Sequence, residues 1–263
     1  FVPTFEHIAN GEKDPRNLIA SFELNHQIVD NFPFTQPENG NILADLFDVA
    51  FCYFPISFTP PANDLYGITA DLLKNNLRGA LAAHRLNADD FFSSLIEKLI
   101  LTNPAAWNDV LPSILASVTR FSFEDLQNHW IPLWNALKYE ILHNDVSQFD
   151  SLNDTIIPKD YIEKMDNTDE FKPLYFTLDI LRTLALKLEA SESIITQFKK
   201  MVFEELKENL CKVSPKLVTQ SVLLVSIIAS VSVSLYNSVV DFILSYSVWG
   251  KYIGIEKDQE VET

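Results

Sequence analysis

Apolar residues recur at the spacing of an α-helix along most of this chain, and this pattern constrains the fold more than any other feature. Leu174, Leu178, Leu181, Ala185 and Leu188 lie at offsets of 0, 4, 7, 11 and 14, which places them on one face of a helix. Glycine, which sheet-rich folds use in their turns, occurs only six times in 263 residues. The sequence therefore predicts an all-α fold.

Capping residues, several of them followed by proline, mark where the helices should begin. An N-cap side chain satisfies free backbone amides of the first turn, and proline suits the first helical position because it has no amide hydrogen to lose. The predicted starts of this kind are Asp14-Pro15, Asn103-Pro104 and Ser214-Pro215, with Thr69, Asn87 and Lys172-Pro173 as further starts. These starts divide the chain into about ten helices with short connections.

Two further helices are predicted with prolines near their ends or inside them. One should stop at Phe54, because Pro55 disfavours helical geometry in the residue before it. Another should open at Ser122 and continue through Trp134, with Pro132 inside it as the cause of a kink.

The distances between predicted helix starts indicate a repeat architecture. The starts at Thr69 and Asn103 are 34 residues apart, and those at Lys172 and Ser214 are 42 residues apart. Helical hairpins of such lengths, stacked in series, describe an α-solenoid of the HEAT type. A compact helical bundle is the alternative.

We divide the chain into consecutive segments of one solenoid domain, which we expect to be a fragment of a longer chain because it begins with Phe1 rather than methionine. The segments are the first helical hairpins (1–54), an extended aromatic and proline-rich strap (55–69), HEAT-like helices (70–143), an acidic mobile loop (144–170), further HEAT-like helices (171–250) and a frayed tail (251–263). The loop is predicted because it holds eight acidic side chains and two lysines with little periodicity.

The uncharged stretch from Leu217 to Val240 is long enough to span a bilayer, but it contains many serines and other polar residues. We expect two buried helices that meet near the serine cluster, with a membrane span as the less favoured alternative.

The strap cannot continue a helix, because the stretch 52–69 contains three prolines, four aromatic residues and a glycine. Phe54, Ile56 and Phe58 alternate, so in an extended chain they point the same way. Pro60-Pro61 favours polyproline geometry and stiffens the segment. The strap is expected either to seal the groove between two helical hairpins or to present a platform to a partner.

Two motifs resemble the N-terminal region of the MMS-nineteen family, called Met-eighteen in yeasts. They read FVPTFEHIANGEKDPRNL at the start of the chain and FDVAFCYFPISFTPPANDLYGIT from Phe47 to Thr69, in the family's order. The chain departs from the family at Leu65, where proline is more common. The motif residues, structural or partner-binding, are Tyr53, Phe54, Pro55, Ile56, Phe58, Pro60, Pro61, Asp64, Tyr66 and Gly67 in the strap motif, and Asp14, Pro15, Arg16, Asn17 and Leu18 in the helix-start motif.

The resemblance implies a scaffold or adaptor fragment of the cytosolic iron–sulfur assembly targeting complex, which delivers clusters to apoproteins of DNA replication, repair and transcription. It implies as partners the other subunits of that complex and client apoproteins such as an XPD-type helicase, primase and DNA polymerases. It also implies a cytoplasmic and nuclear location and no enzymatic activity. The alternative is a HEAT-repeat protein-binding scaffold of another pathway, such as nuclear transport.

Charge and residue types favour the same class of function. The chain has 36 acidic against 20 basic residues, a net charge of −16, which disfavours direct contact with nucleic acid or anionic lipid and favours basic protein surfaces. No HExxH spacing, nucleophile elbow or glycine-rich phosphate loop occurs, so we expect no catalytic residues, no metal and no other cofactor. Cys52 and Cys211 are expected to be buried thiols, and two cysteines cannot supply the four thiolates that usually hold an iron–sulfur cluster.

Overall fold

The regular structure of the chain is helical, as predicted. The computed structural model describes residues 2–34, 40–61, 65–101, 104–143, 172–211, 214–245, 248 and 250, and it contains no β-strand in these ranges. The chain divides into two compact units, Phe1–Leu133 and Trp134–Thr263. In each unit neighbouring helices pack against one another, as in an all-α solenoid. The predicted acidic loop (144–170) and frayed tail (251–263) lie outside the described residues.

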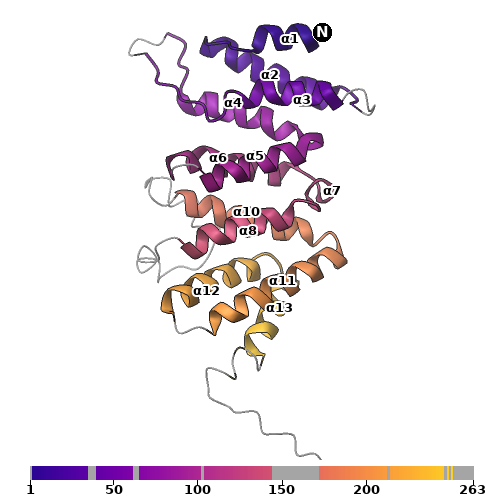
Figure 1. Cartoon of the computed structure of the whole chain (residues 1–263), viewed down its shortest axis with the longest axis vertical. Coiled ribbons are helices and arrows are strands. Elements are labelled where there is room, and N and C mark those ends of the chain that lie inside the picture. The colour runs from indigo at the N-terminus through magenta and orange to yellow at the C-terminus, as the bar shows by residue number, and fades with distance from the viewer. Residues whose placement is uncertain are drawn as a thin grey trace, which may run out of the picture. The chain divides into compact units, whose positions relative to one another are not determined.

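In the first unit successive helices stack on one another (Figure 1). Its elements are α1 (Val2–Ala9), α2 (Pro15–Asn31), α3 (Gly40–Phe51), α4 (Ala70–Ala83), the 3₁₀ turn η2 (Arg85–Asn87), α5 (Ala88–Leu101), α6 (Pro104–Arg120) and α7 (Phe123–Leu126). Helices α2, α4 and α6 pack consecutively and form one layer. Helix α3 packs on α2 and α4, α1 packs on α3, and α5 packs on α6. Figure 1 also shows the connection between α3 and α4 reaching away from these helices.

The second unit is built from α10 (Lys172–Leu188), α11 (Glu192–Leu210), α12 (Pro215–Ala229) and α13 (Val233–Leu244), together with most of α8 (Trp130–His143). Helix α12 packs against α10, α11 and α13. The uncharged stretch forms two helices that meet near the serines, as predicted, but the expected burial of the second is wrong: Val233, Tyr236 and Leu244 of α13 are exposed. Ser232 caps α13 by accepting a hydrogen bond from the Leu235 amide (3.1 Å). Within the described residues, no helix combines the length and apolar character that crossing a membrane requires.

Three helix starts, at Asp14, Thr69 and Ser122, confirm the predicted capping chemistry, but Ser214 precedes α12 without a side-chain cap hydrogen bond. The carboxylate of Asp14 accepts from the backbone amide of Arg16 (2.9 Å), and the hydroxyl of Thr69 accepts from the backbone amide of Leu72 (3.1 Å). Ser122 forms a full capping box with the third residue after it.

The helix that opens at Ser122 is shorter than predicted. It ends at Leu126, and α8 begins separately at Trp130 after a turn. Pro132 therefore lies in the first turn of α8, where a missing amide hydrogen costs no hydrogen bond, and the expected kink is wrong. The proline inside a long helix is instead Pro112 of α6.

Other predictions around the second motif also need correction. The helix expected to stop at Phe54 ends at Phe51, because Cys52 and Tyr53 form a turn whose amides bond back to α3. This turn exposes the Cys52 side chain, and Cys211 is only half-buried, so the prediction of two buried thiols is wrong. Helix α1, which no capping signal announced, precedes the first predicted start.

Candidate interaction surface

The described part of the strap carries neither helix nor strand. Phe54 is buried and Ile56 and Phe58 are half-buried, while the residues between them are exposed. Such alternation is what an extended chain produces when one of its faces lies on the protein. The apolar residues of this stretch therefore face the helices.

Phe54 lies at the end of a row of aromatic rings that reaches into the core. It stacks on Phe51 with the ring centroids 5.6 Å apart, and Phe51 stacks on Phe47 at 5.1 Å. Phe47 in turn meets the edge of Phe91 at 6.3 Å. The ammonium group of Lys98 lies 5.3 Å from the centroid of the Phe51 ring. These contacts hold the start of the strap on α3, whose aromatic rings in turn pack against Phe91 and Lys98 of α5.

Phe54 and Ile56 also cover charged side chains between α4 and α6. They line a small pocket with residues of α4 and α6, among them Lys74, Arg78 and Asp109. The Lys74 ammonium lies 2.7 Å from the Asp109 carboxylate, and burial lowers the pKa of Arg78. The first part of the strap thus shields an ion pair and a partly buried cation from water.

The helix-start motif forms a compact polar turn. Glu12 accepts hydrogen bonds from the backbone amide of Asp14 (2.9 Å) and from the side chain of Asn17 (2.9 Å). Arg16 donates from Nε to Asp14 Oδ1 (3.0 Å), and this bond with the Arg16 amide lowers the pKa of Asp14 to about 2. The pKa of Glu12 is lowered too, chiefly by the Asp14 amide. Leu18 points into the core, so the motif combines a charged turn with a buried anchor.

The two motifs meet. Cζ of Arg16 lies 4.5 Å from the centroid of the Tyr66 ring, a cation–π contact between residues 50 positions apart. The hydroxyl of Tyr53 donates to the carbonyl of Ala9 (2.6 Å) at the end of α1. Sequence reasoning identified both motifs but not their contact, because nothing in either stretch specifies the other.

Exposure divides the strap into a buried base and an exposed tip. Leu65 is 90% and Tyr66 is 64% exposed, whereas Ile68 next to them is buried at 6%. Gly67 has a φ of +64°, a conformation that glycine adopts without strain, and this turns the chain between the tip and Ile68. Pro60 and Pro61 are exposed as well, and Asp64 lies outside the described residues.

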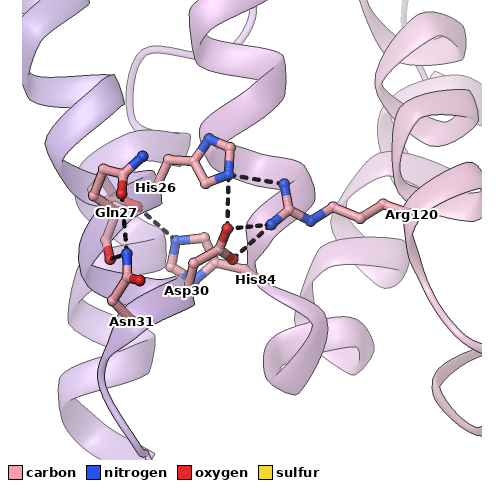
Figure 2. Close-up of polar contacts among 7 residues, drawn as sticks. His26, Gln27, Asp30, Asn31, His84 and Arg120 are labelled. Carbon is pink, nitrogen blue, oxygen red and sulfur yellow. Dashed lines mark hydrogen bonds and ion pairs between the residues drawn. The ribbon is translucent and has the colours of Figure 1, made fainter.

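A polar cluster that the sequence did not predict links α2 with α6 (Figure 2). Nη1 of Arg120, in the last turn of α6, lies 2.8 Å from His26 Nε2, and its Nη2 donates to Asp30 Oδ1 (2.6 Å). His26 Nε2 also lies 3.0 Å from Asp30 Oδ2. The cluster joins residues 90 and 94 positions apart. The i, i+4 spacing of His26 and Asp30 is a local signal, but nothing in the sequence connects this pair with Arg120.

Behind α2, a buried pair ties three elements together. The side-chain nitrogen of Asn25 donates to the carbonyl of Leu46 in α3 (2.8 Å). Its side-chain oxygen is therefore left to accept a hydrogen bond from Nε2 of His84 (2.9 Å), the residue that follows α4. Nε2 of His84 therefore carries a proton, and its Nδ1 has no hydrogen-bond partner among the described residues. Burial lowers the pKa of His84 to about 4.

The part of the chain that the structure describes contains no metal-binding group of three or more histidine, cysteine, aspartate or glutamate side chains. The surface assembled from the two motifs carries apolar, aromatic and charged groups, among them Leu65, Tyr66 and Arg16.

Comparison with known proteins identifies relatives of the chain. Residues 1–143 match the family model described as Dos2-interacting transcription regulator of RNA-Pol-II. The chain is 37% identical over 241 residues to the DNA repair/transcription protein Met-eighteen/MMS19 of Saccharomyces cerevisiae, covering 91% of this chain and 22% of that protein. It is 27% identical over 240 residues to the human MMS19 nucleotide excision repair protein homolog, covering 91% of this chain and 21% of that protein. The chain therefore spans about a fifth of the length of these curated relatives.

Proposed function

Because this chain belongs to the MMS19 family of Dos2-interacting transcription regulators, we propose that it is the N-terminal part of a non-catalytic adaptor that serves DNA repair and transcription. Its relatives in yeast and human are named as a DNA repair/transcription protein and a nucleotide excision repair protein homolog. The family match over residues 1–143 is the observation that carries this proposal.

The adaptor's task in this proposal is to help the cytosolic iron–sulfur assembly targeting complex deliver clusters to apoproteins of DNA replication, repair and transcription. Its partners are the other subunits of that complex and clients such as an XPD-type helicase, primase and DNA polymerases, in the cytoplasm and the nucleus. The cluster is cargo in this scheme, held by other proteins. The chain's two cysteines, Cys52 and Cys211, are fewer than the four thiolates that such a cluster usually needs.

The geometry supports a binding role for the first unit. Packed helices hold a rigid layer, α2–α4–α6, and the strap and helix-start motif join beside it through Arg16 and Tyr66. A surface that is fixed before its partner arrives loses less conformational entropy on binding. Some residues of the two motifs, such as Tyr66, are exposed, and this exposure supports a role in binding.

The test uses the full-length protein in cells. A tagged full-length protein should co-purify with the iron–sulfur targeting subunits, and cells without the protein should contain an XPD-type helicase with little bound iron. Restoring the protein should restore that iron. Normal iron in the helicase of deficient cells would refute the proposal, and co-purification with nuclear import cargo in place of the targeting subunits would favour the scaffold of another pathway.

A further inference from the structure

The structure gives the two ends of the strap and its tip different roles. Phe54 and Ile68, at the two ends, are 8% and 6% exposed, so the chain is anchored on the helices on both sides. Leu65 and Tyr66 lie between these anchors and are 90% and 64% exposed. Packing explains why the ends are apolar, but it does not explain an adjacent leucine and tyrosine in water.

The tip is held in place although it is exposed. The guanidinium of Arg16 lies over the Tyr66 ring at 4.5 Å, and Asp14 fixes that guanidinium through its own carboxylate. Thr69 caps α4 and Ile68 is buried, which fixes the chain immediately after the tip. An exposed tyrosine whose ring is already oriented has the properties of an interface anchor, because little freedom is left to lose on binding.

The net charge of the unit that carries the tip indicates the chemistry of a partner. Residues 1–133 contain 16 acidic and 7 basic residues, a difference of −9. Among the described residues, cations of this unit already form ion pairs: Arg16 with Asp14, Lys74 with Asp109, and Arg120 with Asp30. Exposed carboxylates remain on the same unit, including Asp71 in the first turn of α4, two residues after the strap.

We propose that Leu65 and Tyr66 form a docking tip that inserts into an apolar pocket with a basic rim on a client protein. The acidic unit attracts the basic rim and speeds encounter, and the leucine and tyrosine supply the buried contact. A second copy of this chain would bring two acidic surfaces together and is disfavoured for that reason. The proposal rests on the proposed adaptor function and names the surface that this function uses.

The test measures binding of the purified apo form of an XPD-type helicase to the full-length protein assembled with its targeting subunits. The double variant L65S/Y66S should weaken binding at least about tenfold, with unchanged helical circular dichroism and melting temperature because both residues are exposed. Y66F keeps the ring over Arg16 and should bind like the parent. Raising the salt concentration should weaken binding of the parent.

Matched control variants replace an exposed leucine and an exposed tyrosine elsewhere, L86S and Y139S, whose side chains are 56% and 55% exposed. They should leave binding unchanged. Equal affinity of L65S/Y66S and the parent would overturn the docking tip and leave the adaptor function standing. Self-association that L65S/Y66S abolishes would show a second copy as the occupant and would also overturn it. An assembled parent protein that binds neither the helicase nor other cluster-containing clients would refute the adaptor function itself, and the docking tip with it.

Discussion

Lowering the pH from about 7 to about 5 should destabilise the first unit through one buried side chain, His84. Its side chain is completely buried, it donates from Nε2 to Asn25, and its Nδ1 has no partner among the described residues. Burial is the main cause that lowers its pKa to about 4; nearby His26 lowers it further, and Asp30 opposes the shift. The folded protein therefore holds His84 neutral.

The sign and size of the effect follow from proton linkage. The unfolded chain binds a proton on His84 below its ordinary pKa of 6.5, whereas the folded protein does not bind it until about 4. Stability is therefore present above the ordinary pKa and is lost as the pH falls. Between about pH 7 and about pH 5 the loss in the free energy of unfolding is about 2 kcal/mol, and it approaches about 3 kcal/mol at still lower pH.

The assay compares urea unfolding of the parent chain and of His84→Gln at both pH values, followed by circular dichroism. Glutamine is neutral throughout and can still donate to Asn25, so the variant should lose about 2 kcal/mol less than the parent when the pH is lowered. Every other titrating group is common to both proteins and cancels in this difference. His7→Gln, at an exposed position of α1, is the matched control for removing an imidazole. If the parent and His84→Gln respond to pH identically, the reasoning about His84 is wrong.

Three further predictions concern stability. Phe54→Ala removes a buried ring that stacks on the aromatic row and should cost ~3–5 kcal/mol, and Phe58→Ala should cost less because its ring is half-buried; equal shifts in melting temperature would contradict this. Ser122→Ala removes the capping box of α7 and should cost about 1 kcal/mol in urea unfolding, a loss that an unchanged midpoint would disprove. Glu205→Gln weakens an ion pair with Lys138 (2.7 Å) that is partly exposed, so it should cost at most about 1 kcal/mol and less at high salt; an effect that grows with salt would speak against it.

The sequence predicted the features whose physics is local. Asp14, Thr69 and Ser122 were identified as helix starts because a cap needs only a side chain and an amide two or three residues later. The prediction of a continuous helix through Pro132 failed because no such local signal marks the break. The turn at residues 127–129 ends α7 without a glycine or proline.

The contacts that build the surface could not be predicted, because they join distant parts of the chain. The pairing of Arg16 with Tyr66 depends on how α2 and the strap pack, and the bond between Asn25 and His84 spans 59 positions. Sequence periodicity assigns Asn25 to a helix but does not say which group it meets. The exposure of Leu65 likewise depends on the tertiary path of the strap, since leucine is equally common in cores.

The link from Asn25 to Leu46 and His84 also bears on how a repeat protein avoids assembling in the wrong order. Stacked helices present similar apolar faces, so one helix can replace another with little loss of packing free energy. If a segment other than the one ending at His84 packed there, the Asn25 side-chain oxygen would be buried without a hydrogen bond, at a cost of about 1–3 kcal/mol in stability. The His84 imidazole would also lose its hydrogen-bond partner. This buried polar contact therefore specifies which segment packs beside α2 at this step of the stack, which apolar contacts alone do not do.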